Sequence, residues 1–258
     1  MVLTSKHGPS KYFNKNIFYQ YDHFYKKIVH FRFISINHTF YAVLYFIYGG
    51  NIMTELEKCM AGEYYNCHDK IFLDFKQTSR ELLKKYHELQ YEQKQEKTEI
   101  LKQLFGQIGT NVSVGQPFIC DYGRNIYLGS NVSINMNCTF VDCNKIEIGN
   151  NVLIASNVQL YTAAHPVELS ERLTPHWMPE DPSMESGTYF CRTYALPIKI
   201  GNGCWLGGGV IVLPGVTIGD GSVIGAGSVV TKDIPKNSLA VGNPCRLIRQ
   251  INKYSQEK

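Results

Sequence analysis

The chain has 258 residues, a formal net charge of +4 and eight cysteines. This length accommodates one sizeable domain with a small appendage. The cysteines form no Cys-x-x-Cys pair, and their spacing matches neither a zinc module nor a dense disulfide framework. We therefore expect reduced thiols in a cytoplasmic protein, and no metal. Because the excess positive charge lies in residues 1–52, outside any recognisable binding motif, we expect no nucleic-acid partner.

Residues 1–52 differ in composition from the rest of the chain. They are rich in Phe, Tyr, Asn and Lys and keep no helical or alternating period for long. Their most apolar run, residues 40–48, has nine residues, against the roughly 20 that cross a bilayer. We therefore expect a foreign or disordered extension without a membrane span, and Met53 is a candidate natural start. A membrane-associating leader is the alternative.

Residues 53–108 predict a small helical subdomain. The stretch TELE at residues 54–57 is a capping-box pattern, which predicts a short helix ending at Gly62. Apolar residues then recur at three- and four-residue steps over 72–89, and a third apolar group lies at 100–105. These patterns predict three helices.

Residues 109–250 follow a period of six. Aliphatic or aromatic residues recur in two blocks, at Leu128, Ile134, Phe140, Ile148, Ile154 and Leu160, then at Ile200, Leu206, Val212, Ile218, Ile224 and Val230. A six-residue unit supplies one short strand and one turn, and three units close a triangular coil of ~18 residues. Gly or Asn at the corners supplies positive φ. The pattern predicts a mainly β fold, a parallel β-helix interrupted by a loop over 166–196 and followed by a tail, 251–258.

The first block of repeats ends at the stretch YTAAHPV, residues 161–167, which contains His165. A histidine side chain has an ordinary pKa of ~6.5 and is mostly neutral near pH 7, which suits a general base. The alternative is a histidine bound to a backbone partner at a corner of the coil.

Several segments resemble one known family. They are MTELEKCMAGEYYN, CDYGRNIYLGSNVSIN, LIASNVQLYTAAHP, LPIKIGNGCWLGGGVIVLPGVTIGDGSVIGAGSVVTKDIP and AVGNPCRLIR. Over residues 53–258 the chain is similar to the galactoside and maltose O-acetyltransferases of the hexapeptide-repeat superfamily, and to the nodulation acetyltransferases. The resemblance implies a left-handed parallel β-helix, a homotrimer, and direct transfer of acetyl from acetyl-coenzyme A to a sugar hydroxyl.

The resemblance also implies roles for individual residues. In the family the His of the T-A-x-H-P motif is the catalytic base, which places that role on His165. Asn135 matches an asparagine that helps to stabilise the transition state, although a corner asparagine with positive φ is an alternative. The implied acceptor contacts are Asp69, Asp121, Asn135, Cys143 and Thr193.

Three of these acceptor positions leave alternatives open. Cys67 competes with Asp69 for one contact. Cys143 stands where some relatives carry an acid, and Asp142 lies beside it. Either of the aspartates Asp69 and Asp121 could instead be a turn or cap residue.

The resemblance places coenzyme A on residues of the second block and the basic stretch after it. These are Gly208, Ala226, Thr231, Lys232, Arg246 and Arg249. The two arginines suit phosphate groups, because the guanidinium is planar and always charged. We further expect the loop after His165 to cover the acceptor, with Trp177 and Tyr194 as sugar-stacking rings.

Three other functions are alternatives to a sugar O-acetyltransferase. The acceptor could be serine, an amino sugar or a xenobiotic. The chain could also be a non-catalytic β-helix subunit of an assembly. A γ-type carbonic anhydrase shares the β-helix but needs three zinc-binding histidines. Residues 106–258 contain only His165 and His176, so this last function is not expected.

Overall fold

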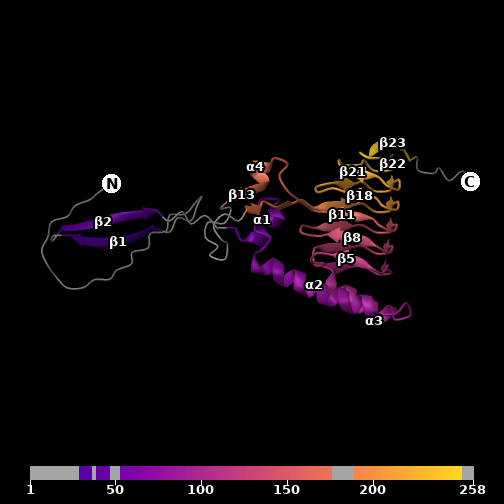
Figure 1. Cartoon of the computed structure of the whole chain (residues 1–258), viewed down its shortest axis with the longest axis horizontal. Coiled ribbons are helices and arrows are strands. Elements are labelled where there is room, and N and C mark those ends of the chain that lie inside the picture. Colours follow the sequence, from indigo (N-terminus) through magenta and orange to yellow (C-terminus); the bar gives the residue numbers. More distant parts are fainter. Residues whose placement is uncertain (1–28, 37–38, 47–52, 176–188, 252–258) are drawn as a thin grey trace, which may run out of the picture. The chain divides into compact units, whose positions relative to one another are not determined.

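The computed structural model describes residues 29–36, 39–46, 53–175 and 189–251. The chain divides into two compact units, Met1–Met53 and Thr54–Lys258. In the first unit β1 (Val29–Ile36) pairs antiparallel with β2 (Thr39–Phe46) (Figure 1). Most of residues 1–52 lie outside the described ranges, so the expected foreign or disordered extension stays a prediction.

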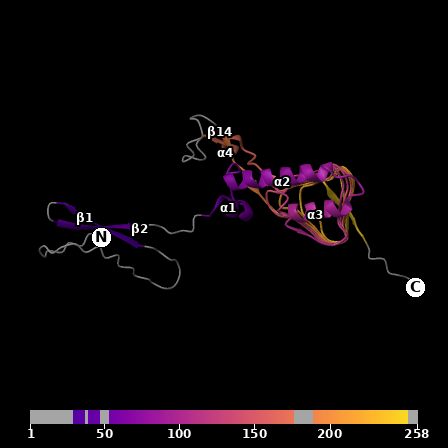
Figure 2. The same cartoon turned by 90° about the horizontal axis from the view of Figure 1, so that it is seen from below.

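The second unit begins with the three predicted helices, which are confirmed. They are α1 (Glu55–Ala61), α2 (Lys70–Glu88) and α3 (Lys94–Leu104). Thr54 and Glu57 form the capping box of α1, and Gly62 ends that helix with a φ of 80°. Figures 1 and 2 show α2 and α3 lying across one end of the stacked coils. Their buried side chains, such as Tyr86 and Leu104, join the core of the coils.

The coils form three parallel sheets that make the faces of a prism. The first sheet holds β4 (Ser113–Val114), β7 (Ser133–Ile134), β10 (Leu153–Ile154), β17 (Trp205–Leu206), β20 (Val223–Ile224) and β22 (Ser238–Val241), with β23 (Arg246–Gln250) antiparallel to β22. The second holds β5 (Phe118–Cys120), β8 (Cys138–Val141), β11 (Gln159–Tyr161), β18 (Ile211–Val212) and β21 (Val229–Val230). The third holds β3 (Gln107–Ile108), β6 (Ile126–Leu128), β9 (Ile146–Ile148), β16 (Ile198–Ile200) and β19 (Thr217–Ile218).

The period of six arises because each six-residue unit points the same positions into the prism, such as Val152 and Ile154 or Val210 and Val212. All twelve residues predicted to point inward are buried, from Leu160 at 0% exposure to Ile154 at 3%. Equivalent residues stack on one another, as Ile154 does between Ile134 and Leu206. Burial of one such side chain contributes about 1.5–3 kcal/mol. The predicted fold class, a mainly β parallel β-helix with a helical region before it, is confirmed.

The coils are not all the same length. Residues stacked in the early coils are 20 positions apart, whereas those in the later coils are 18 apart. The two additional residues enlarge the turns over 121–125 and 141–145, because the inward-pointing residues on either side of these turns are eight positions apart, as Phe140 and Ile148 are, instead of six. Both turns lie where the second sheet meets the third. We call this corner the second–third edge, and the corner where the first sheet meets the second the first–second edge.

The chain leaves the prism at the second–third edge. After β11, β12 (Ala163–Ala164) pairs antiparallel with β15 (Tyr194–Ala195). Between them lie α4 (Leu169–Arg172) and β13 (Leu173–Pro175), which pairs with β14 (Tyr189–Cys191). We call residues 165–196 the excursion. Trp177 lies outside the described residues.

No helix within the described ranges is long and apolar enough to cross a bilayer.

Candidate active site

His165 lies at the start of the excursion, where a backbone partner orients its ring. Its Nδ1 atom is 2.8 Å from the carbonyl oxygen of Arg192. The Sγ atom of Cys191 lies 3.2 Å from the same nitrogen, and the Oγ1 atom of Thr193 lies 3.5 Å from it. A carbonyl oxygen can only accept, so this contact requires the proton on Nδ1 and leaves the lone pair on Nε2. The side chain is exposed, so Nε2 can accept a proton from a ligand.

The ribbon formed by β12 and β15 has two faces. Ala164 pairs with Tyr194, and side chains alternate along each strand. His165 and Thr193 therefore share one face, which agrees with the 3.5 Å contact between them, while Tyr194 lies on the other. Tyr194 lines a cavity of about 550 Å³ together with Tyr64 and Pro166. The expected stacking of Tyr194 on a sugar stays a prediction, and it would have to take place on this face of the ribbon.

The loop between α1 and α2 brings Cys67, and not Asp69, to Thr193. The Oγ1 atom of Thr193 lies 3.8 Å from the Sγ atom of Cys67, and Tyr65 forms a β-bridge with Thr193. Asp69 is the N-cap of α2, where its carboxylate accepts a hydrogen bond from the Ile71 amide at 3.0 Å. The cap interpretation of Asp69 agrees with this geometry.

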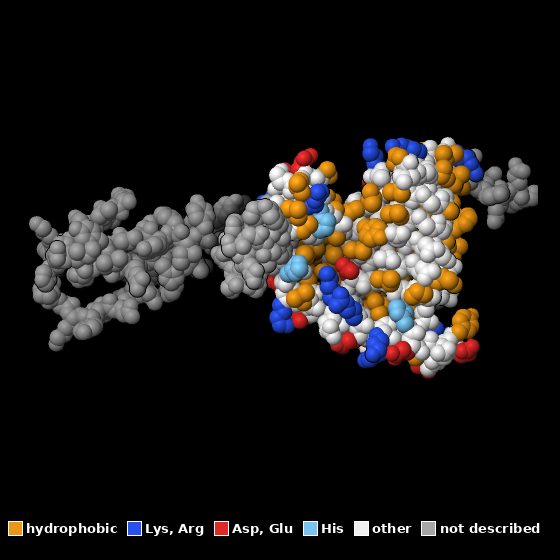
Figure 3. All heavy atoms as spheres, in the orientation of Figure 1, with side chains coloured by type: hydrophobic (Ala, Val, Ile, Leu, Met, Phe, Trp, Pro, Cys, Tyr) orange, Lys and Arg blue, Asp and Glu red, His pale blue; other side chains and the backbone are white. Residues whose placement is uncertain are grey.

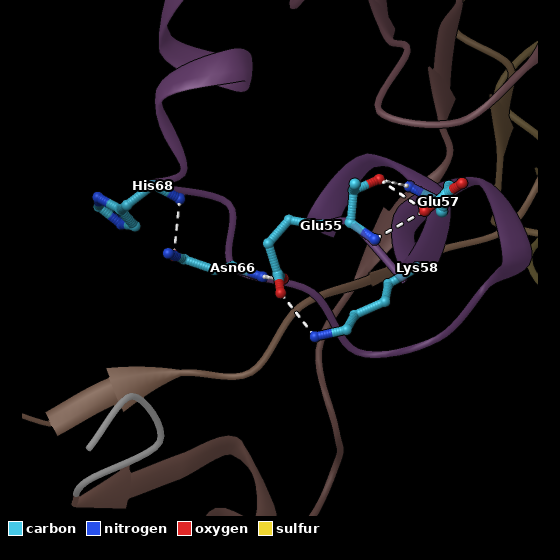
Figure 4. A network of polar contacts seen from close by, with 6 residues as sticks. Glu55, Glu57, Lys58, Asn66 and His68 are labelled. Carbon is cyan, nitrogen blue, oxygen red and sulfur yellow. Dashed lines mark hydrogen bonds and ion pairs between the residues drawn. The ribbon is translucent and has the colours of Figure 1, made fainter. Parts of the chain in front are cut away.

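Glu55 holds the same loop in place. Its carboxylate accepts hydrogen bonds from the Asn66 amide at 2.5 Å and from the Lys58 ammonium at 2.6 Å (Figure 4). Asn66 in turn accepts a hydrogen bond from the His68 amide at 3.0 Å. The start of α1 thus fixes the loop that carries Cys67.

The two enlarged turns bring Asp121 and Cys143 together. The Sγ atom of Cys143 lies 3.5 Å from a carboxylate oxygen of Asp121. Burial and the nearby Asp121 carboxylate raise the pKa of the Cys143 thiol well above its usual range, so the thiol donates to Asp121. Asp142 faces the opposite way and is fully buried. This chain therefore presents a neutral thiol to Asp121.

Asn135 lies on the first–second edge, away from His165. It is exposed and is not among the residues with positive φ, a conformation that Asn137 adopts instead at 61°. Asn135 precedes β8, whereas His165 follows β11, the strand stacked on β8. A four-residue strand spans about 10 Å. One chain therefore holds these two residues at opposite ends of the second sheet.

The residues expected to contact coenzyme A divide between the same two edges. Gly208 and Ala226 lie on the first–second edge, while Thr231 and Lys232 follow β21 onto the second–third edge. A Cβ atom at Gly208 would meet only the Ser156 carbonyl, at 3.5 Å, so the backbone is open to close approach there.

The end of the prism beyond Ala226 is basic. Arg246 and Arg249 are exposed on β23, and Figure 3 shows Lys and Arg side chains gathered over β22 and β23. An open backbone edge that ends in cations fits a thioester on a long polar arm with phosphates at its far end. Within the described ranges, no group of three or more His, Cys, Asp or Glu residues could hold a metal ion.

Two contacts of this site have no signal in the sequence. The Arg192 carbonyl and the Cys191 thiol reach His165 only because β12 and β15 pair across the whole excursion. A backbone acceptor leaves no trace in residue type, and Cys191 is one of eight dispersed cysteines.

A triangular parallel β-helix with a helical region at one end and a histidine-bearing excursion defines a hexapeptide-repeat transferase. The family model described as bacterial transferase hexapeptide (six repeats) matches residues 197–232. The model described as maltose acetyltransferase hexapeptide capping motif matches residues 58–109.

Solved structures agree with these matches. A maltose O-acetyltransferase from Clostridium difficile 630 is 44% identical, with a TM-score of 0.69, covering 78% of this chain and 99% of that one. A galactoside acetyltransferase in complex with coenzyme A is 38% identical, with a TM-score of 0.69 and coverage of 78% and 92%. A hexapeptide-repeat acetyltransferase from Vibrio cholerae O1 biovar eltor, complexed with acetyl coenzyme A, is 31% identical, with a TM-score of 0.66 and coverage of 78% and 100%. The chain belongs to the hexapeptide-repeat acetyltransferases of the maltose and galactoside O-acetyltransferase type, and it is an acetyltransferase.

Proposed function

We propose that the chain transfers acetyl from acetyl-coenzyme A to a hydroxyl group of a sugar, with His165 as general base. The observation that carries this proposal is the 2.8 Å contact between the Nδ1 atom of His165 and the Arg192 carbonyl. It leaves the Nε2 lone pair exposed, as a base for an incoming hydroxyl requires. The names of the maltose and galactoside relatives support a sugar as the acceptor.

In this proposal acetyl-coenzyme A supplies an activated thioester, and the protein supplies position and proton transfer. Nε2 of His165 takes the proton of the acceptor hydroxyl as the hydroxyl oxygen attacks the carbonyl carbon of the acetyl group. The carbon–sulfur bond of the thioester then breaks, and coenzyme A leaves as a thiol after its sulfur takes up the proton from Nε2. Asp121 and Thr193 contact the acceptor, and Cys67 takes the place first expected for Asp69. Asn135 donates to the charge that develops on the acetyl oxygen.

The placement of these residues supports a homotrimer. Asn135, Gly208 and Ala226 lie on the first–second edge, whereas His165 and Lys232 lie on the second–third edge. One acetyl group cannot contact both Asn135 and His165 of the same chain across the second sheet. Two copies packed side by side, with unlike edges together, would complete one site, and three copies would close a ring.

The test of the base replaces His165 by Ala. Loss of a general base lowers turnover on the order of 10²–10⁴-fold. We expect the His165→Ala variant to lose about this much activity in a thiol-release assay and to bind acetyl-coenzyme A normally by calorimetry. His87→Ala serves as the control, because His87 lies on α2 and accepts from the Phe118 amide. Turnover at the wild-type rate in His165→Ala would reject the assignment.

The acceptor class needs a separate measurement. We expect acetyl-coenzyme A consumption with maltose, glucose and galactosides to exceed that with serine or glucosamine. A preference for serine or for the amine of glucosamine would replace the sugar hydroxyl in the proposal but leave the role of His165 intact.

A further inference from the structure

Four buried polar residues follow one another along the second–third edge. They are Asn125 at 6% exposure, Asp142 at 0%, Asn144 at 1% and Thr162 at 0%. A buried polar group is costly unless it is hydrogen-bonded, so the partners of these residues show what they hold in place. We call these four residues the polar column.

Two members of the polar column, Asn125 and Asp142, hold the turn that carries Asp121. The Asp142 carboxylate accepts hydrogen bonds from the amides of Asp121 at 3.0 Å, Tyr122 at 2.8 Å and Asn125 at 3.3 Å. The Asn125 side chain donates back to the Asp142 carbonyl at 2.8 Å. The turn is therefore wrapped around a buried carboxylate, and the Asp121 side chain remains directed at Cys143.

The other two members, Asn144 and Thr162, hold β15, the strand next to His165. The Asn144 side chain donates to the Cys59 carbonyl of α1 at 3.0 Å and to the Ala195 carbonyl of β15 at 2.8 Å. Thr162 accepts from the Asn144 amide at 2.9 Å, and its hydroxyl donates to the Val141 carbonyl at 2.7 Å. The strand fixed in this way, β15, continues directly from Arg192 and Thr193, which contact His165.

We propose that the polar column is a positioning device that sets Asp121 against His165. This inference rests on the proposed function, because it assigns the residues that align the acceptor with the base. Asn125, Asp142, Asn144 and Thr162 are positioning residues, since each acts through the backbone of another segment. Apolar packing is non-directional, whereas these hydrogen bonds fix angle and distance. Alignment matters because misplacement of reacting groups by about 1 Å costs on the order of 100-fold in rate.

The charge environment of Asp142 supports a specific role. Among the described residues, Asp121 and Cys120 are the titratable groups that influence it, and no cation forms an ion pair with it. Burial raises the pKa of Asp142 to about 7, while the hydrogen bonds from the backbone of Tyr122, Gly123 and Asn125 act in the opposite direction. Apolar side chains would suffice if this turn only had to be buried. An acid at this position instead provides acceptors for the backbone amides of the turn.

The test compares variants at the two ends of the polar column. Asp142→Asn keeps the size but replaces Oδ2, which accepts from the Asn125 amide, by a donor, so we expect the acceptor KM to rise about tenfold and the KM for acetyl-coenzyme A to stay within about twofold. Thr162→Val removes the hydroxyl, and we expect kcat to fall about tenfold. Thr162→Ser retains the hydroxyl and should restore kcat, which a merely steric role would not predict.

Ser222→Ala is the matched control for stability. Ser222 is also fully buried, and its hydroxyl donates to the Pro235 carbonyl at 2.8 Å on a different corner of the prism. We expect this variant to lower Tm without changing either KM or kcat. The inference is overturned if Asp142→Asn and Thr162→Val behave like Ser222→Ala, with lower Tm and unchanged kinetic constants.

A measurement without turnover separates failure of this inference from failure of the proposed function. In amide hydrogen exchange, Asp142→Asn should speed exchange over 118–126, and Thr162→Val over 189–196, with little change over 217–224. If the wild-type protein acetylates no acceptor, the proposed function fails, and exchange still decides whether the polar column holds the two segments. Unchanged exchange in both variants overturns the inference. If Asp142→Asn fails to fold, the comparison of Thr162→Val with Thr162→Ser is the test.

Discussion

At the scale of single residues, side chains that are neighbours in the sequence point in different directions and so have different partners. Asp142 and Cys143 are adjacent in sequence, yet the acid is fully buried and the thiol lies 3.5 Å from Asp121. His165 owes the free lone pair on Nε2 to one carbonyl oxygen, that of Arg192. In both cases the function of a side chain depends on which backbone groups its surroundings present.

Asp142 predicts a pH dependence of stability. Its folded-state pKa of about 7 lies above the value of about 3.9 expected in the unfolded chain. Between these values the folded protein holds a proton that the unfolded chain has lost, so the free energy of unfolding falls as pH rises, by up to about 1.4 kcal/mol per pH unit. Measured from pH 5 to pH 8, the Tm of the wild type should decrease relative to that of Asp142→Asn. A constant difference between the two would contradict the raised pKa.

At the scale of elements, short strands obtain their stability from stacking. Strands such as β10, Leu153–Ile154, have only two residues, too few to be stable alone, but each pairs with the coil on either side. Local repetition and burial of alternate side chains together build the prism. The helices add a closed end, since Tyr86 and Leu104 share the core of the coils.

Strand β11 offers a direct test of this alternation. Leu160 points inward at 0% exposure, whereas its neighbour Gln159 points outward. Leu160→Ala should lower the free energy of unfolding by about 2–5 kcal/mol through lost burial and a residual cavity. Gln159→Ala should change it by less than about 0.5 kcal/mol. Denaturant titrations at one protein concentration measure both, and similar losses for the two would contradict the assignment of faces.

At the scale of the whole molecule, the two edges of the second sheet separate the residues expected to act together. Asn135 lies at one end and His165 at the other, so a shared site requires a second copy of the chain. The proposed trimer follows from the length of one face of the prism and not from any apolar patch.

A mixing experiment tests this arrangement. His165→Ala and Asn135→Ala should each be inactive alone. When the two variants are refolded together in equal amounts, about a quarter of the sites in random trimers pair an intact His165 with an intact Asn135 from a neighbour. We expect activity to recover toward that fraction of the wild-type value. Absence of recovery in mixtures that sedimentation shows to be mixed oligomers would place both residues in one chain's site.

Some features of this protein are determined by its sequence alone. The six-residue period predicts the β-helix, the capping box at Thr54 predicts the start of α1, and the interruption after Leu160 marks His165. Each of these signals is local, because one coil or one helix turn depends on residues close together in the chain. The prediction of three helices between Glu55 and Leu104 succeeded for the same reason.

Only the tertiary structure decided which of the candidate residues meet. The Arg192 carbonyl reaches His165 through pairing of β12 with β15, and Cys67 reaches Thr193 while Asp69 caps α2. The two additional residues in each enlarged turn break the alternation that would otherwise show which side chains point inward, so the opposite directions of Asp142 and Cys143 could not be deduced. Along a regular strand, the periodicity of the sequence determines which side chains point inward. At a turn, the direction of a side chain depends instead on hydrogen bonds to distant segments.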